Sequence, residues 1–331
     1  MAAVAIVLAG CATANVDPAP TTIVLYNAQH EQTTTALTRA FTKQTGIVVR
    51  VDNDNEGVLT AKIVQEGSRS PADVIFTENS NWLQQLADRG LLASVQSSTL
   101  TAIPAADSAA DGEWVGISAR MSSMVYNTKA LSASELPTSV LEFADPKWKG
   151  KIELAPSETD FWPIVSSVED TYGHATALTW LKGLKANAGA NIVPDNETLV
   201  SDVNKGVAQL GIVNHYYFAR LKAETSAGSL HAGLGYFSPK DAGYIKTISG
   251  AAILKSSHYS SAAQKFVAFL TSHAGQDTIA RGDSFEYPLA AGIAPNPAIA
   301  PLSQLSPSGF SAAEFGTGQQ AKKLLQEAEL L

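Results

Sequence analysis

Two adjacent tyrosines, Tyr216 and Tyr217, are the residues of this sequence best suited to hold a metal ion. A phenolate is a hard oxygen donor, and a tyrosine with a pKa of about 10 gives up its proton only to a strong Lewis acid or base. Fe(III) is such an acid. Successive side chains diverge in a regular strand, but in an irregular turn or in the first residues of a helix both phenols could bind one ion. Taken alone, such a pair more often packs its rings and hydrogen-bonds its hydroxyls to water.

A histidine and a glutamate follow two predicted strands at the point where each strand ends. His30 comes after the apolar run 22–26, and Glu78 comes after the run 73–76. Helical spacing and a further strand at 47–51 complete a βαβ unit, which predicts a parallel sheet. The carboxyl ends of parallel strands form the rim where ligands bind. Structural alternatives stay open, because His30 could cap the next helix or bond a backbone carbonyl, and Glu78 could pair with a helix cap.

The middle of the chain begins a second cycle of strands and helices. Apolar and β-branched runs predict strands at 113–118, 123–126, 152–154, 207–213, 245–248 and 251–254. A helix is predicted to open at 155–157 and to run to Val168. The strand at 207–213 leads directly into the tyrosine pair. Two α/β lobes, each with polar residues at its strand ends, would face one another across a cleft, as in hinge-closing binding proteins.

The composition excludes several classes of function. The chain has 331 residues and a formal net charge of −8, from 23 basic and 31 acidic residues. No basic stripe interleaved with aromatic residues is present, so nucleic acid is not an expected partner. The sequence also lacks the Gly-x-Ser-x-Gly, His-Glu-x-x-His and Walker patterns that would indicate an enzyme.

The only cysteine, Cys11, ends a short apolar run. The residues 8–11 match a lipobox, in which the cysteine is acylated and becomes the new N-terminus. The run is shorter than the roughly 20 apolar residues that span a bilayer, and it lacks the basic start of a complete signal peptide, so we expect the true start to lie upstream. Residues 12–22 would then form a tether. The alternative is an untargeted apolar N-terminus with a chance cysteine.

The motifs around these residues resemble those of one known family. They are Tyr-Asn-Ala-Gln-His-Glu at 26–31, Ser-Pro-Ala-Asp-Val-Ile-Phe-Thr-Glu at 70–78 and Asn-His-Tyr-Tyr at 214–217. Further stretches at 66–73, 145–150, 180–185 and 249–256 resemble the same family. The family is that of the periplasmic ferric-ion-binding proteins, the transferrin-like solute-binding proteins of ABC importers. The resemblance extends from about residue 22 to the C-terminus.

The resemblance implies a fold and a metal site. It implies a two-lobed α/β fold of the type II periplasmic-binding-protein kind, with a ligand cleft and a hinge between the lobes. The N-terminal lobe would comprise 22–120 and 247–298, and the C-terminal lobe 121–246 and 299–331, after a signal and tether at 1–21. The implied ligands of Fe(III) are His30, Glu78, Tyr216 and Tyr217.

The resemblance also implies a synergistic anion beside the iron, at the N-terminus of the helix predicted to begin at 156–160. Glu158 and Asp160 stand where phosphate-binding relatives often have a small-residue turn, and two carboxylates would repel a phosphate. We therefore expect carbonate or water, or Glu158 itself, in place of phosphate. The residues implied to lie near this anion are Arg120, Ser157, Glu158, Asn196 and Asn214, with His215 outside the ligand set.

The function that follows is capture rather than catalysis. Fe(III) would bind first to the lobe that carries the tyrosines, and the other lobe would close over it with His30 and Glu78. The protein would be a monomer outside the cytoplasm, lipid-anchored or periplasmic, and would deliver iron to a membrane permease with its ATPase. Two alternatives remain: a protein of the same fold that binds an organic or oxyanion ligand, and a metal-dependent hydrolase with Glu78 as base and His30 as ligand.

Overall fold

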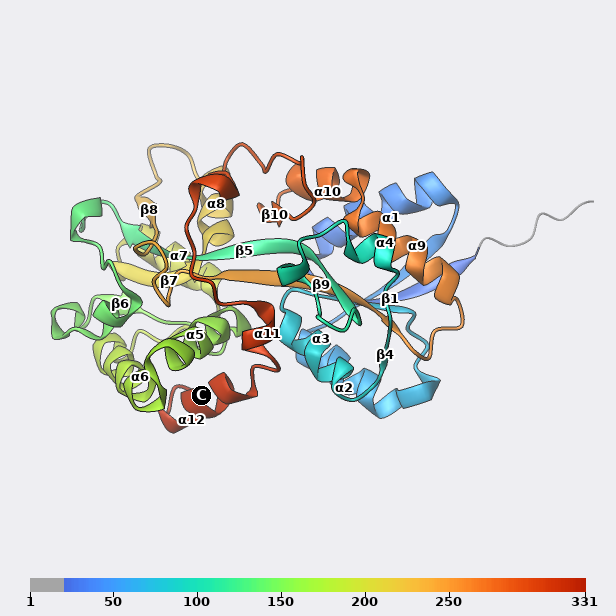
Figure 1. Ribbon diagram of the computed structural model, residues 1–331. Helices are drawn as coiled ribbons and strands as arrows, with labels where there is room; N and C mark the ends of the chain where they lie inside the picture. Colours follow the sequence, from blue (N-terminus) through green and yellow to red (C-terminus); the bar gives the residue numbers. More distant parts are fainter. Residues whose placement is uncertain (1–20) are drawn as a thin grey trace, which may run out of the picture.

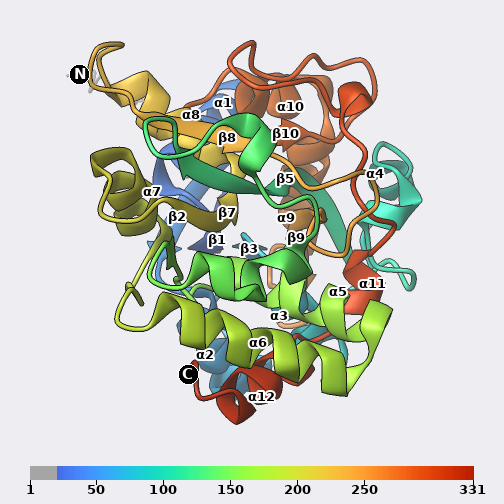
Figure 2. The ribbon, with the colours of Figure 1, turned by 90° about the vertical axis from the view of Figure 1, so that its left-hand side faces the viewer.

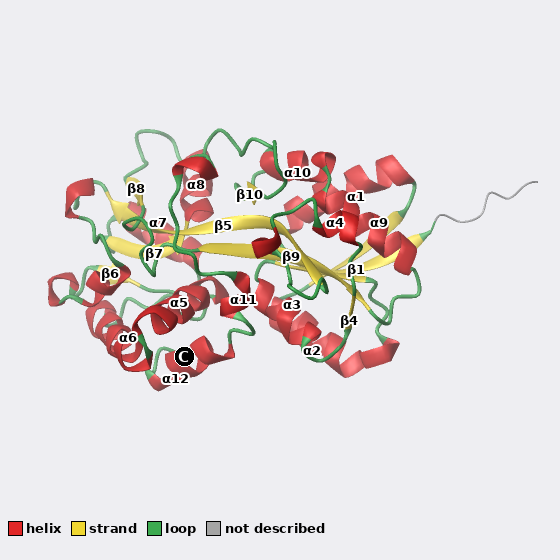
Figure 3. Cartoon of the chain, in the orientation of Figure 1, coloured by secondary structure: helices red, strands yellow, loops and turns green. Residues whose placement is uncertain are grey.

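A mixed ten-stranded β-sheet organises the computed structural model, which describes residues 21–331. The strand order is β2-β1-β3-β9-β5-β7-β6, with β4 paired to β9, and with β8 and β10 paired to β5. Figure 3 shows the strands in yellow, running through the middle of the molecule between the helices. The strands are β1 (Thr22–Ala28), β2 (Val48–Asn53), β3 (Val74–Thr77), β4 (Leu92–Ala93), β5 (Trp114–Asn127), β6 (Ile152–Glu153), β7 (Leu210–Asn214), β8 (Ala232–Gly235), β9 (Lys246–Leu254) and β10 (Tyr287–Pro288). Cys11, the predicted lipidation site, lies outside the described residues.

Helices surround the sheet in two groups, one at each end of it (Figures 1 and 2). The group near β1 contains α1 (Glu31–Thr45), α2 (Glu56–Glu66), α3 (Ser80–Ala87), α4 (Ser97–Leu100), α9 (Ser260–Thr271) and α10 (His273–Ala280). The group near β7 contains α5 (Trp162–Tyr172), α6 (His174–Ala188), α7 (Asn196–Lys205), α8 (His215–Glu224) and α12 (Gln319–Glu327). No helix in residues 21–331 has both the length and the apolar character needed to cross a membrane.

The first half of the sheet has the predicted βαβ arrangement. β1 pairs in parallel with both β2 and β3, and α1 and α2 connect them in turn. Gly46 ends α1 with φ of 73°, a left-handed conformation that glycine adopts without steric cost. The parallel pairing places the carboxyl ends of β1 and β3 at one edge of the sheet, where His30 and Glu78 follow them.

Two long strands, β5 and β9, run between the two halves (Figure 1). β5 pairs with β9 from Trp114 to Met121 and then with β7 from Ser122 to Tyr126, while β9 also pairs with β3. The prediction of separate strands at 113–118 and 123–126, and again at 245–248 and 251–254, is therefore wrong. Polar residues between the predicted runs, among them Arg120 and Ser122 of β5 and Ser249 of β9, are buried within the continuous strands.

The predicted start of the helix at 155–157 is also wrong. Residues Thr159–Phe161 form a single 3₁₀ turn, and α5 begins only at Trp162. Proline is favoured in the first turn of a helix because it has no N–H to leave unpaired. Pro156 and Pro163 could each stand in the first turn of a helix, and Pro163 is the one that lies in the first turn of α5.

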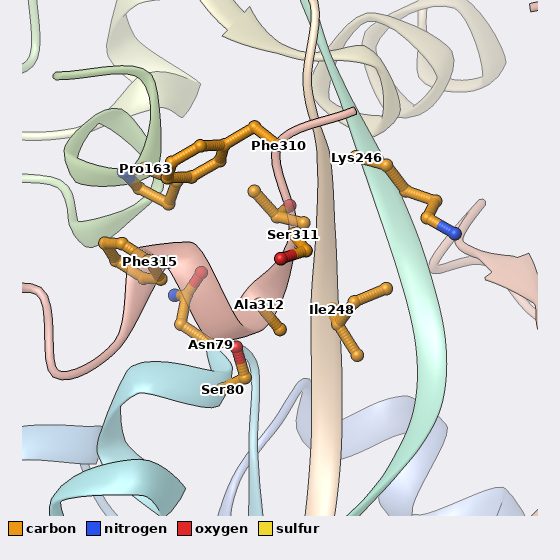
Figure 4. A pocket seen from close by; sticks show the side chains of 10 residues that line it. Asn79, Ser80, Pro163, Lys246, Ile248, Phe310, Ser311, Ala312 and Phe315 are labelled. Carbon is orange, nitrogen blue, oxygen red and sulfur yellow. The ribbon is translucent and has the colours of Figure 1, made fainter. Parts of the chain in front are cut away.

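A short segment near the C-terminus packs beside the two long strands. Figure 4 shows α11 (Ala312–Phe315) between Pro163 of α5 and the start of α3, beside Ile248 of β9. The space left among these side chains is only about 10 Å³. The predicted α/β class with two lobes is confirmed by this arrangement and by the structural relatives described below; the residue boundaries given for the lobes stay a prediction.

Candidate metal centre

The tyrosine pair lies in the first turn of α8, directly after β7 ends at Asn214. Both rings are buried, and their centroids are 4.1 Å apart at an interplanar angle of 30°. Both hydroxyls donate to the same atom, Oδ2 of Asp160, at 3.1 Å each. Tyr216 and Tyr217 therefore converge on one point, as expected for adjacent residues at the start of a helix but not in a strand.

His30 and Glu78 reach the same place from the other half of the molecule. His30 Nδ1 lies 2.5 Å from Glu78 Oε1, and the His30 ring centroid is 5.3 Å from that of Tyr216. The structural alternatives for these two residues do not hold. His30 occupies the N-cap position of α1 but makes no side-chain cap bond, and Asn79 rather than Glu78 occupies the N-cap position of α3. The structure brings all four predicted ligands together.

Arg120, in the middle of β5, is fully buried among carboxylates. Its Nη1 lies 3.3 Å from Glu78 Oε2 and 3.9 Å from Glu286 Oε1, and its Nη2 lies 3.5 Å from Asp160 Oδ1. Nη2 also donates to Asn79 Oδ1 at 2.7 Å. One guanidinium thus holds acidic residues from three distant parts of the chain, which explains why a charged residue can occupy a sheet interior.

Burial controls the protonation of these groups. It raises the pKa of both Tyr216 and Tyr217 well above the ordinary value, and the nearby carboxylate of Asp160 raises the pKa further. Burial alone would lower the pKa of His30, but the charge of Glu78 raises it above the ordinary value. Burial alone would raise the pKa of Glu78, but His30 and then Arg120 lower it. The phenols therefore stay protonated until a strong Lewis acid displaces their protons.

The residues predicted near an anion are only partly gathered at the centre. Glu158 lines the cavity beside the tyrosines, and burial, followed by the charge of Asp160, raises its pKa to about 8. Asn214 is buried, with Nδ2 unbonded, and Asn196 is buried at the start of α7. Ser157 does not belong to the centre, because it is exposed and donates instead to the carbonyl of Pro194 at 3.1 Å.

Two adjoining cavities open beside the centre, with volumes of about 410 and 570 Å³. Both are lined by His30, Gln32, Glu197, Tyr217 and Arg220. The first continues between β1, β2 and the turn at Glu158. These cavities give the buried donors access to solvent.

Half of the side chains that meet at this centre are tyrosines. Within residues 21–331 no group of three or more histidine, cysteine, aspartate or glutamate side chains is arranged to hold a metal ion. Two phenols, one imidazole and one carboxylate meet here instead. Hard oxygen donors of this kind fit a small, highly charged cation.

A family profile described as "Bacterial extracellular solute-binding protein" matches residues 36–306. The chain belongs to this family. One similar relative of this solute-binding protein is the "Fe(3+)-binding periplasmic protein" of Serratia marcescens, 38% identical over 309 residues, which cover 93% of this chain and 90% of the relative.

Two solved structures have the same fold. Iron-bound HitA from Pseudomonas aeruginosa is 38% identical and superimposes with a TM-score of 0.89, covering 93% of this chain and 99% of HitA. The Trichodesmium protein IdiA (FutA), in complex with iron and citrate ligands, is 28% identical with a TM-score of 0.83, covering 93% and 99%. The prediction that this solute-binding protein is a binding protein and not an enzyme is confirmed, and the hydrolase alternative is thereby removed.

Several residues of the centre were not predicted as part of it from sequence. Arg220 lies one helical turn after Tyr216 in α8, and its Cζ is 4.8 Å from the centroid of that ring. Helical spacing could have revealed this contact. Glu286 accepts from Ser118 and Gln29 and lies near Arg120, but no motif marks it. His215, which was expected to lie outside the ligand set, is fully buried; its Nδ1 accepts from the N–H of Met121, and its Nε2 lies 2.9 Å from the carbonyl oxygen of Phe285.

Proposed function

We propose that this solute-binding protein captures Fe(III) in the cleft between its two halves and delivers it to an ABC importer. The observation that carries the proposal is the convergence of both tyrosine hydroxyls on one point, beside His30 and Glu78. These four side chains would be the protein ligands. Two phenolates and one carboxylate balance the charge of a ferric ion, which a buried site requires.

The structure has the contacts expected of a closed cleft. Thr159, in the turn before α5, lies 3.2 Å from Glu56 Oε2 and accepts from Asn79 Nδ2 at 3.1 Å. Glu56 and Asn79 belong to the opposite half, so these bonds join the two halves beside the metal centre. β5 and β9 connect the halves through the sheet, and we infer that they form the hinge. Iron would enter when the cleft opens, meeting the tyrosines first.

The pH dependence follows from the phenols. Both must lose a proton before they can bind iron, so the affinity falls as the pH falls. Their raised pKa strengthens this competition between protons and metal. Acid would therefore favour release of the ion.

The relatives support the same assignment. The Serratia protein is named for binding Fe(3+) in the periplasm, and the Pseudomonas structure contains iron. By extension, we place this protein outside the cytoplasm, with a permease and its ATPase as partners. We further propose a lipid anchor at Cys11. Incorporation of labelled palmitate into the full-length protein, lost in Cys11→Ser, would support the anchor; equal labelling of both would refute it.

Iron titration of the purified protein tests the assignment. We expect a visible tyrosinate-to-iron charge-transfer band, strongly reduced in Tyr216→Phe and in Tyr217→Phe and absent from the double variant. Tyr172→Phe, at a tyrosine that is 41% exposed, is the matched control and should keep the full band. A double variant that retained the band would show that the tyrosines are not ligands.

A further inference from the structure

The segment 312–318 near the C-terminus touches both halves of the molecule. It leads directly into α12, which packs against α5 and α6 of the half that carries the tyrosines. Its helix α11 also contacts α3, which belongs to the half near β1. Figure 4 shows Ala312 and Phe315 of α11 close to Asn79 and Ser80 at the start of α3. The segment therefore forms a contact between the halves that is separate from the metal ligands.

One backbone carbonyl makes the polar part of this contact. The oxygen of Thr317 accepts a hydrogen bond from Gln85 Nε2 at 3.1 Å and a longer one from Asn81 Nδ2 at 3.5 Å. Both donors lie on α3, and both side chains are buried. These two bonds join a residue of the tyrosine-bearing half to a helix of the opposite half.

Gly318 allows the segment to approach α3 closely. Its φ of 68° lies in the left-handed region that favours glycine. A Cβ at this position would lie 3.1 Å from Phe315 Cζ and 3.2 Å from Asn81 Nδ2. Only about 10 Å³ of space remains where α11, the start of α3 and β9 meet. The two surfaces are thus closely fitted in the arrangement of the halves that the structure shows.

The opposite half holds α3 at two places. At the start of the helix, Asn79 Nδ2 donates to Thr159 Oγ1 at 3.1 Å. About two turns further on, Gln85 donates to the carbonyl of Thr317. Contacts at two places along one helix determine its direction. Because Glu78 directly precedes α3, the direction of α3 also determines where Glu78 lies relative to the tyrosines.

We propose that the contact between Thr317 and α3 forms as the cleft closes and stabilises the closed state. The inference rests on the function proposed above, in which the halves close over iron by rotation about β5 and β9. Thr317 is anchored to one half through α12, and Gln85 belongs to the other, so the rotation must displace them relative to each other. A displacement of about 1 Å takes both hydrogen bonds beyond their normal range.

A contact that exists in only one of two states shifts the equilibrium towards that state by its own free energy. Tight binding of iron requires the closed state, because only then do His30 and Glu78 meet the tyrosines. Loss of the contact therefore lowers the apparent affinity for iron by the factor by which closure is weakened. A hydrogen bond of this kind corresponds to a factor of about 3–10.

The test measures iron affinity in variants of Gln85, using the full-length protein and competition with a chelator. Gln85→Ala removes the donor, and we expect its affinity to fall about 3–10-fold. Gln85→Glu keeps the shape of the side chain but brings a carboxylate against the Thr317 carbonyl, so its loss should be larger. At saturating iron both variants should form the full tyrosinate band. Without iron, small-angle X-ray scattering should give Gln85→Glu a larger radius of gyration than wild type.

Two further measurements separate closure from folding. Gln44→Glu, at an exposed position of α1, introduces the same change of charge and should bind iron as wild type does. Denaturant unfolding of the iron-free proteins reports any general loss of stability. We expect Gln85→Ala to lose iron affinity by a larger factor than it loses stability in the iron-free state, because the contact is absent from the open form.

The outcomes distinguish this inference from the function on which it rests. Unchanged iron affinity in Gln85→Ala and Gln85→Glu overturns the role of the contact and leaves the iron site intact. A loss of stability or of folding without iron, with no loss of affinity in the folded fraction, shows a permanent contact and also overturns it. Failure of the wild-type protein to form a tyrosinate band contradicts the proposed function itself.

Discussion

His30 Nδ1 lies 2.5 Å from Glu78 Oε1, while the other ring nitrogen of His30, Nε2, is buried and has no hydrogen-bond partner in the described structure. Histidines that bind metals commonly donate the N–H of one nitrogen to a carboxylate and use the second nitrogen as ligand. Because Glu78 pairs with Nδ1, the nitrogen of His30 that remains free to bind a metal ion is Nε2. It also links two strand ends, β1 and β3, that would otherwise meet only through the sheet.

Removal of this imidazole should weaken iron binding without abolishing it. In His30→Ala the tyrosines of the other half remain, so the charge-transfer band should persist. We expect the affinity, measured by competition with a chelator, to fall about 10–100-fold. His258→Ala, at an exposed histidine, is the control. Complete loss of the band in His30→Ala would contradict initial capture by the tyrosine-bearing half.

Arg120 should stabilise the iron-free protein more than the iron-bound one. Its removal in Arg120→Gln leaves the carboxylates of Glu78, Asp160 and Glu286 without their buried cation. We expect the free energy of unfolding to fall by about 3–5 kcal/mol, the range for breaking a buried ion pair. Bound Fe(III) should recover part of this loss. The measurement is denaturant unfolding with and without iron, and an equal loss in both states would contradict the prediction.

Glu153, at the end of β6, should make the stability depend on pH. It is buried, its Oε2 has no hydrogen-bond partner, and burial raises its pKa from 4.5 to about 7, with a smaller effect of Asp202. The folded protein thus binds this proton more tightly than the unfolded chain, so stability decreases as the pH rises from about 4.5 to about 7.

The variant Glu153→Gln cannot ionise and should escape this decrease. Its advantage over wild type should be small near pH 4.5, grow as the pH rises and become constant above about pH 7. An advantage of about 1–3 kcal/mol is expected there, because a pKa raised from 4.5 to about 7 corresponds to at most about 3 kcal/mol of stability lost when the carboxyl ionises. Parallel stability curves of the two proteins between these pH values would refute the assignment.

Gly116 should tolerate no side chain at the register shift in β5. A Cβ at this position would lie 2.1 Å from the carbonyl oxygen of Asp107, a backbone atom that cannot rotate away. We expect Gly116→Ala to lower the free energy of unfolding by about 1–3 kcal/mol. Gly228→Ala is the control, because nothing lies within 4 Å of its Cβ. Chemical denaturation of both variants provides the comparison.

Much of the site could be predicted because its residues follow strand ends. Apolar runs locate β1, β3 and β7, so His30, Glu78 and the tyrosines could be assigned to the rim of the sheet before their contacts were known. The resemblance of the motifs to one family then predicted that His30 and Glu78 bind the same ion as the tyrosines. Neither the apolar runs nor the motif resemblance requires knowledge of how the side chains pack.

The remainder depended on contacts that no local pattern encodes. Arg120 lies between the two runs that were predicted as separate strands, yet it is buried within β5 because Glu78, Asp160 and Glu286 surround it from distant segments. The start of α5 was misplaced because two prolines fit the same rule. The contact of Asp160 with both tyrosine hydroxyls has no sequence pattern of its own, because Asp160 lies 56 residues before Tyr216.

The position of β9 between β3 and β5 has a consequence for biosynthesis. Strands near the start of the chain cannot complete their sheet until a segment near residue 250 has been made. Pairing across such separations is slow, so a nascent chain keeps open edges for most of its synthesis. Delayed folding suits a polypeptide that must pass through a narrow translocation channel, and the same order of events exposes it to aggregation if export stalls.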